Sequence, residues 1–121
     1  MTYNDQNIFA KILRGEIPCN KIYEDDYVLS FYDINPQKKI HALVIPKGRY
    51  IDLDDFNSNA SNDEIVGLMK GITTVSKKLG ISSIHGKGYR ALANISDYGG
   101  QEVPHLHFHL FGGEKVGKMV S

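Results

Sequence analysis

The sequence is poor in cysteine, in net charge and in long apolar runs, and each shortage excludes a class of protein. Cys19 is the only cysteine among 121 residues, so the chain forms no internal disulfide and no multi-thiolate metal cage. Fourteen basic residues balance fourteen acidic ones, so the chain has no net positive charge that would attract nucleic acid or anionic lipid. No apolar stretch approaches the roughly 20 residues that a membrane helix needs. We therefore expect one cytoplasmic domain over residues 1–121, with no signal peptide, nucleic-acid partner or membrane anchor.

The hydrophobic patterning predicts an α+β fold with about five antiparallel strands, one long helix and one short helix. The short helix is expected over residues 8–14, with Asn7 as its cap. The long helix is expected to begin at a capping box formed by Ser61 and Glu64, and to end at Gly80. Alternation and turn residues place the strands at 21–24, 27–32, 41–45, 89–95 and 105–111.

The most informative pattern is a run of three alternating histidines near the C-terminus. His105, His107 and His109 are separated by Leu106 and Phe108. In an extended strand the three imidazoles would share one face, with neighbouring histidines about 6.6 Å apart. A neutral imidazole attacks phosphorus near pH 7 and can later leave, while a flanking histidine can transfer a proton. The run therefore predicts phosphoryl chemistry, with a phosphate beside the central ring and a histidine on either side.

Two other interpretations of the histidines stay open on the residues alone. Two strand histidines spaced i, i+2 are a common zinc pair, to which His41 would add a third ligand. The histidines would otherwise be structural. The upstream residues Gly99, Gly100 and Gln101 favour the phosphoryl interpretation, because glycine N–H groups and a donating amide suit a phosphate cradle. A pair of glycines is also ordinary in turns.

Residues 99–113 resemble the histidine triad motif, in which histidines alternate with apolar residues. The similarity is to the histidine triad nucleotide-binding branch of that superfamily, of bacterial type, and extends to residues 8–18, 33–36 and 41–47. The resemblance implies a homodimer whose two five-stranded sheets join into one. It also implies hydrolysis of purine nucleoside phosphoramidates through a nucleotidyl-histidine, with no metal or other cofactor. The alternatives are a dinucleoside polyphosphate hydrolase and a non-catalytic or zinc-binding adaptor.

The same resemblance implies a role for each candidate residue. His107 matches the nucleophile, the carbonyl of His105 is expected to hold its reactive tautomer, and His109 would contact the phosphate and the leaving group. His41 matches a histidine that supports this row from an adjacent strand, and Asp33 falls where relatives bind the ribose hydroxyls. The base, sugar and phosphate contacts are expected from Ile8, Phe9, Ile12, Phe31, Ile34, Asn94, Gly100, Gln101, Glu102 and Val103.

Two departures from the family pattern bear on the choice of leaving group. Glu102 stands where some relatives carry a hydroxyl residue, and a carboxylate there would repel phosphate unless it is protonated or paired. Glu102 would instead carry a proton or favour cationic leaving amines. The tail after Gly113 is short, whereas in relatives it reaches toward the partner's site.

The homodimer has weaker support from the residues themselves. The segment 89–95 is apolar enough that an exposed sheet edge would be a liability. Pairing with its twin across a twofold axis would remove that liability.

Overall fold

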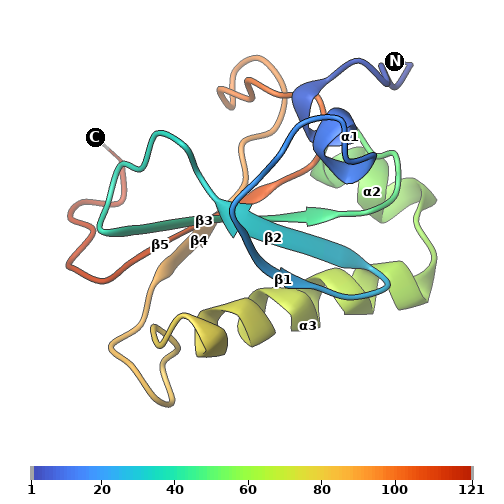
Figure 1. Ribbon diagram of the computed structural model, residues 1–121. Helices are drawn as coiled ribbons and strands as arrows, with labels where there is room; N and C mark the ends of the chain where they lie inside the picture. Colours follow the sequence, from blue (N-terminus) through green and yellow to red (C-terminus); the bar gives the residue numbers. More distant parts are fainter. Residues whose placement is uncertain (1, 121) are drawn as a thin grey trace.

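The computed structural model describes residues 2–120, so Met1 and Ser121 lie outside the described residues. It contains one five-stranded antiparallel sheet, in the order β1-β2-β3-β5-β4 (Figure 1). The strands are β1 (Lys21–Glu24), β2 (Val28–Tyr32), β3 (Ile40–Pro46), β4 (Arg90–Leu92) and β5 (Phe108–Gly112). The helices are α1 (Ile8–Leu13), α2 (Leu53–Asn59) and α3 (Asn62–Lys78). The predicted α+β fold with five antiparallel strands is confirmed.

The sheet separates two apolar clusters, because alternate side chains of each strand point to opposite faces. On β3, Ala42 and Val44 belong to the cluster under α3, while Leu43 and Ile45 belong to the cluster against α1. Figure 1 shows α3 running below the sheet and α1 above it. Leu110 of β5 is fully buried on the α3 side, and such a side chain stabilises the fold by about 2 to 3 kcal/mol. The large α3 cluster supports the sheet from one side, so that the other face, next to α1, can hold side chains in fixed positions.

Both predicted helices form, and their ends follow the expected capping chemistry. The side chain of Asn7 accepts a hydrogen bond from the Ala10 N–H at 2.9 Å. Ser61 and Glu64 form the complete capping box at the start of α3. Gly80, with φ of +74°, follows the end of α3 in the left-handed conformation that glycine adopts without strain.

Helix α2 was not among the predicted elements. Its N-cap is Asp52, whose side chain accepts a hydrogen bond from the Asp55 N–H at 2.8 Å. Phe56 is the only buried residue within the helix itself. A single buried position in seven residues produces no apolar stripe, so periodicity could not reveal this helix.

The last two strands are shorter than predicted. The strand expected to start at His105 begins at Phe108, because its pairing with β3 ends at Phe108 opposite Val44. The N–H of His105 donates to the Val103 carbonyl at 2.9 Å, and that of Leu106 donates to Tyr50 at 2.9 Å. Strand β4 is short for the same reason. Its pairing with β5 ends at Leu92 opposite His109, next to the first residue of β5.

Within residues 2–120, none of the helices combines the length and the apolar character that crossing a bilayer requires.

Candidate functional site

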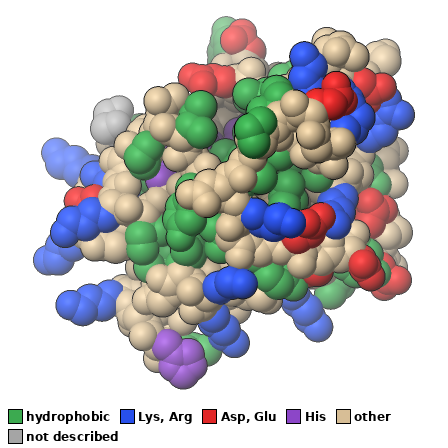
Figure 2. Space-filling view, in the orientation of Figure 1, with side chains coloured by type: hydrophobic (Ala, Val, Ile, Leu, Met, Phe, Trp, Pro, Cys, Tyr) green, Lys and Arg blue, Asp and Glu red, His purple; other side chains and the backbone are tan. Residues whose placement is uncertain are grey.

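A cavity of about 760 Å³ lies on the α1 face of the sheet, over the strands that α1 leaves uncovered. His107 and His109 line it from the chain leading into and along β5, and Phe9 of α1 forms part of its wall. In Figure 2 most histidine atoms are almost hidden between other side chains, and one histidine protrudes at the lower edge of the molecule. Of the residues predicted for the site, the cavity contains Phe9, Asp33, Asn94, Gly100, Glu102, Val103, His107 and His109.

The His107 ring is held by the backbone immediately before it. Its Nδ1 lies 2.7 Å from the carbonyl oxygen of His105, which can only accept, so Nδ1 carries the proton. Burial lowers the pKa of His107 below its usual value, and the ring is neutral near pH 7. The remaining nitrogen, Nε2, therefore has a free lone pair. An imidazole in this state is a nucleophile.

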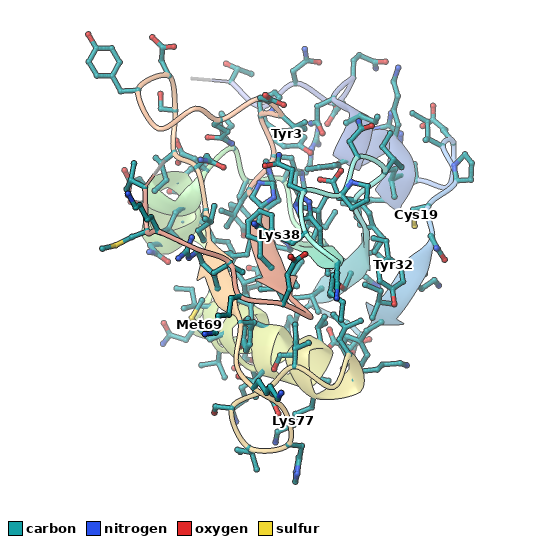
Figure 3. All side chains as sticks on the ribbon, turned by 90° about the vertical axis from the view of Figure 1, so that its left-hand side faces the viewer. Tyr3, Cys19, Tyr32, Lys38, Met69 and Lys77 are labelled. Carbon is teal, nitrogen blue, oxygen red and sulfur yellow. The ribbon has the colours of Figure 1, made fainter. Side chains whose placement is uncertain are left out.

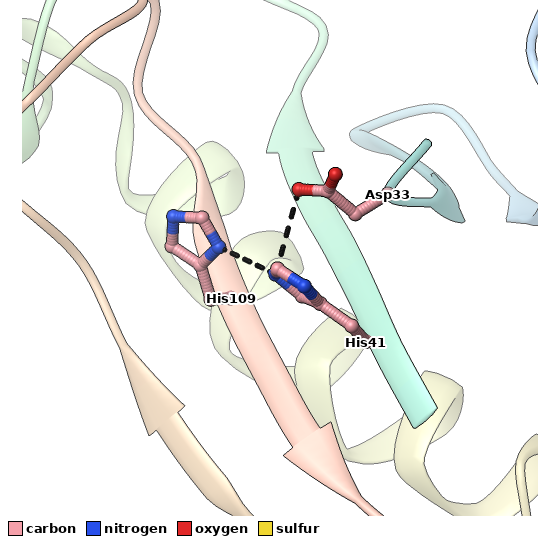
Figure 4. Close-up of side chains that lie close together, drawn as sticks. All are labelled: Asp33, His41 and His109. Atoms are coloured by element: carbon pink, nitrogen blue, oxygen red, sulfur yellow. Dashed lines mark hydrogen bonds and ion pairs between the residues drawn. The ribbon is translucent and has the colours of Figure 1, made fainter. Parts of the chain in front are cut away.

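The His109 ring is held by a side chain on the neighbouring strand. The Gln37 N–H donates to Nδ1 of His41 at 3.2 Å, so the proton of a neutral His41 is on Nε2. That Nε2 lies 2.9 Å from Nδ1 of His109 and 3.5 Å from Oδ2 of Asp33 (Figure 4). Because His41 donates, Nδ1 of His109 accepts, and the proton of His109 is on Nε2.

Burial and neighbouring imidazoles keep these rings neutral. Burial lowers the pKa of His41, against the opposing effect of Asp33. Burial, followed by His107 and His41, lowers the pKa of His109 to about 4. The His107 and His109 rings lie 5.1 Å apart between centroids. The cavity thus contains two adjacent imidazoles of opposite character: His107 has a bare Nε2, and His109 has an Nε2–H donor.

The structure corrects the prediction that a histidine lies on either side of the phosphate. His105 is fully buried, and its Nε2–H donates to the Pro46 carbonyl at 2.9 Å. The hydroxyl of Tyr3 lies 2.6 Å from its Nδ1. Burial lowers the pKa of His105 to about 4, and the ring faces the protein interior. The predicted row on one face does form: His105 and His107 both contact Phe9 on the α1 side, and the intervening apolar residues pack in the α3 cluster. What differs from the prediction is that the His105 ring does not line the cavity.

Gln101, predicted to donate to phosphate, does not line the cavity, and its amide is bonded within the protein. Its amide nitrogen donates to the carbonyl oxygens of Ile51 at 2.6 Å and Val103 at 3.0 Å. Its amide oxygen accepts from the Ser96 N–H at 2.9 Å. Gln101 therefore braces the loop before the triad. The loop reaches the cavity through Gly100, whose φ of +76° suits glycine.

The predicted base slot is only partly assembled. Phe31 is buried beneath the cavity in the cluster against α1, and Ile12 packs against the edge of that cluster. Ile8 and Ile34 are 42% and 87% exposed, and neither lines the cavity. Asp33 lines it and accepts a hydrogen bond from the Asn35 N–H at 2.8 Å.

Several cavity residues were missed in the sequence. Leu43 and Phe111 lie two residues from His41 and His109 on their strands, so period-two alternation could have found them. Tyr3, which bonds to His105 across 102 residues, gave no local signal. The other unpredicted lining residues are Asn35, Gln37, Lys38, Arg90, Leu92, Val116, Lys118 and Met119.

One cluster of side chains has the composition of a metal site. Ligand atoms of Asp33, His41 and His109 all lie within 4.8 Å of one another. A cation on Nε2 of His41 would require the proton to move to Nδ1. There it would face the Gln37 N–H, 3.2 Å away, with two donors opposed. The backbone around His41 therefore favours a hydrogen-bond chain over a metal centre.

Comparison with known proteins agrees with this geometry. The HIT domain model matches residues 14–116. An uncharacterized HIT-like protein of Azospirillum brasilense is 48% identical over 120 residues, which cover 99% of this chain and 96% of that protein. A purine nucleoside phosphoramidase of Escherichia coli is 39% identical over 117 residues, covering 97% and 95%. A solved HIT family hydrolase from Clostridium thermocellum superposes with a TM-score of 0.85 at 35% identity, covering 98% and 99%. With a triad of this geometry and relatives this similar along its length, the chain belongs to the HIT family.

Proposed function

We propose that the chain is a purine nucleoside phosphoramidase, which hydrolyses a P–N bond through a nucleotidyl-histidine on His107. The observation that carries the proposal is the opposite protonation of two adjacent rings, a bare Nε2 on His107 and an Nε2–H on His109. The name of the Escherichia coli relative supports the substrate class. No cofactor is needed, because both steps require only proton and nucleotidyl transfer.

In the first step, the lone pair on Nε2 of His107 forms a bond to the α-phosphorus, and the bond to the leaving nitrogen breaks. The bond electrons stay on that nitrogen, which takes a proton from His109. When the substrate binds, its phosphate anion favours the imidazolium form of His109, so the ring takes up a proton from solvent and its Nε2 proton becomes available to the leaving nitrogen. The His107 ring becomes positively charged, and the His105 carbonyl, 2.7 Å from Nδ1, stabilises that charge.

In the second step, water attacks phosphorus and gives its proton to the now neutral His109. The bond from phosphorus to Nε2 of His107 breaks, and its electrons return to the imidazole. The nucleoside monophosphate leaves, His109 returns its extra proton to solvent, and both rings regain their starting states. One water is consumed for each amine and nucleotide released.

Nucleotide binding is assigned to the side of the cavity nearest Asp33. A carboxylate accepts hydrogen bonds from ribose hydroxyls, and Phe9 and Leu43 provide apolar surface for the base. Ile8 and Ile34 do not line the cavity but adjoin its residues Phe9 and Asp33 in the chain, and we propose that a bound purine extends over their exposed side chains. Asn94 and Gly100 would contact the sugar and phosphate. The zero net charge of the chain agrees with a small anionic ligand and not with nucleic acid.

A cytoplasmic homodimer is part of the proposal. Strand β4 pairs with β5 alone among the described residues, and it forms one end of the sheet order. Its open edge could add a partner's β4 and extend the sheet across a twofold axis. Sedimentation at micromolar concentration should yield the dimer mass, and a monomer would contradict this part.

The test of the proposed function is to trap the adduct. Adenosine phosphoramidate is mixed with the protein, and the reaction is quenched in base within one turnover. The protein is then digested, and its peptides are analysed by mass spectrometry. An adenylyl group is expected on His107, and none on His85, an exposed histidine outside the cavity. Product release without any adduct, or an adduct consistently on another residue, would overturn the proposal. A dinucleoside polyphosphate assayed in parallel is expected to be the poorer substrate.

A further inference from the structure

The N-terminal segment reaches the histidine triad although it precedes the residues matched by the HIT domain model. The Tyr3 hydroxyl lies 2.6 Å from Nδ1 of His105. The two rings also meet edge to face, with centroids 5.7 Å apart. Figure 3 shows Tyr3 in the upper part of the molecule, near the chain that leads into β5. A tyrosine from the start of the chain is thus in direct contact with the first residue of the triad.

The partners of His105 determine the direction of this hydrogen bond. Its Nε2 faces the Pro46 carbonyl, which only accepts, so Nε2 carries the proton. Burial keeps the ring neutral, which leaves Nδ1 without a proton. Tyr3 is therefore the donor, and both ring nitrogens of His105 have partners.

The side-chain bonds of His105 add to the few backbone bonds of a segment that lies outside the strand ladder. Strand β5 starts only at Phe108, and before it the backbone has two isolated bonds, from the His105 N–H to Val103 and from the Leu106 N–H to Tyr50, in place of a continuous ladder. The carbonyl of His105 is nevertheless the group that keeps the proton of His107 on Nδ1. Fixing the His105 ring at both nitrogens restrains the backbone that carries this carbonyl.

Tyr3 is itself held in place by charged residues. Arg49 forms an ion pair with Asp5, and its guanidinium carbon lies 5.5 Å from the centre of the Tyr3 ring. Arg14 donates a second bond to the Asp5 carbonyl at 2.9 Å. These contacts anchor the segment from Tyr3 to Asp5 against the body of the protein, so the tyrosine hydroxyl is presented to His105 in a defined orientation.

We propose that Tyr3 is a positioning residue for the reaction, acting through His105 on the orientation and tautomer of His107. This role rests on the proposed function of His107. Tyr3 does not line the cavity and touches no reacting atom. Its contribution is to keep Nε2 of His107 bare and correctly directed.

The test compares Tyr3→Phe with Tyr23→Phe. The first change removes the hydroxyl but keeps the ring against His105. The second also removes a single tyrosine hydrogen bond, this one on β1, from the Tyr23 hydroxyl to Oδ2 of Asp25 at 2.8 Å. Loss of one positioning hydrogen bond predicts about a tenfold fall in kcat for Tyr3→Phe, with KM changed less than about twofold. Tyr23→Phe should retain the wild-type kcat.

¹⁵N NMR of the unliganded protein distinguishes a positioning role from a purely structural one, because it reports the tautomer of each histidine ring. In Tyr3→Phe, the ¹⁵N resonance of His105 Nδ1 should shift toward the free imine value, and His107 should begin to populate its second tautomer. Arg49→Gln keeps the hydroxyl but loosens the segment, so it should produce the same changes at smaller amplitude.

Unchanged histidine resonances, or a kcat for Tyr3→Phe equal to that of Tyr23→Phe, would overturn the role of Tyr3. Wild-type protein without phosphoramidase activity would instead overturn the proposed function. Comparing the thermal midpoints of the two tyrosine variants excludes a general loss of folding as the cause, since both lose one hydroxyl bond.

Discussion

His107 and His109 are two residues apart, face the same cavity, and are held in opposite ways. The Nδ1 of His107 donates to a backbone carbonyl on its own segment. The Nδ1 of His109 accepts from His41, a side chain on the neighbouring strand β3. In each ring, the partner of Nδ1 decides what Nε2 presents to the cavity. In His107 it is a lone pair, and in His109 it is a proton.

The two kinds of support also differ in what can disturb them. A backbone carbonyl cannot be removed by substitution, so His107 responds only to changes that move the chain around His105. A side-chain partner can be removed directly, which makes His109 the ring whose protonation can be reset by one mutation.

Replacing the nucleophile should have the largest effect. His107→Ala or His107→Asn is expected to reduce turnover of adenosine phosphoramidate by about 10⁴-fold or more, because the neighbouring ring, His109, has its proton on the nitrogen that faces the cavity. Nucleotide binding measured by calorimetry should remain within a few-fold of wild type. Full activity in either variant would remove the distinction between the two rings.

Replacing the proton donor should have the next largest effect. His109→Gln keeps a polar group but loses a titratable ring, and kcat should fall by about 10²-fold, typical of one general acid-base group. His85→Gln is the matched control, since His85 is exposed and does not line the cavity. Equal losses in the two variants would indicate a non-specific cause.

Acid should destabilise the fold because the triad histidines are buried in their neutral form. The pKa of His105 is lowered by burial to about 4, whereas an unfolded histidine titrates near 6.5. Between these values the unfolded chain binds more protons, so stability is lost as pH falls from about 6.5 toward 4. For His105 alone the loss at pH 5 is about 2 kcal/mol. Urea denaturation at pH 7 and pH 5 measures it, and a midpoint that does not fall would contradict the burial.

Breaking the side-chain support should have the smallest effect on rate. His41→Asn removes the donor to His109, so that ring distributes its proton between both nitrogens and kcat falls by about tenfold, the usual scale for such supporting partners. In a double-mutant cycle, adding His41→Asn to His109→Gln should cause little further loss. Additive losses would show that His41 acts on the substrate by another route.

Local sequence signals predicted most of the framework. Caps at Asn7 and Ser61 act within three residues, so their chemistry is visible in the sequence. Alternation on β3 likewise reflects two buried faces. Helix α2 escaped because Phe56 alone anchors it, and the start of β5 was misjudged because Pro104 and His105 form a turn despite a strand-like pattern.

The site was predictable in its members and less so in its contacts. The resemblance placed Asp33, His41 and His109 in one candidate site, and in the structure their side chains are adjacent. It did not indicate the bonds made by Gln37 or Tyr3. These depend on a main-chain N–H and on a contact across 102 residues, for which neither residue type nor spacing provides a signal.

The sequence by itself determined the chemical groups: three alternating imidazoles, a fourth on an earlier strand, balanced charge and two apolar faces for a sheet. Only the tertiary structure decided which nitrogen of each imidazole carries the proton. The two tautomers of a free imidazole differ little in free energy, so the choice falls to whatever donor or acceptor the fold brings within about 3 Å. Here those partners are a carbonyl for His107 and a neighbouring ring for His109.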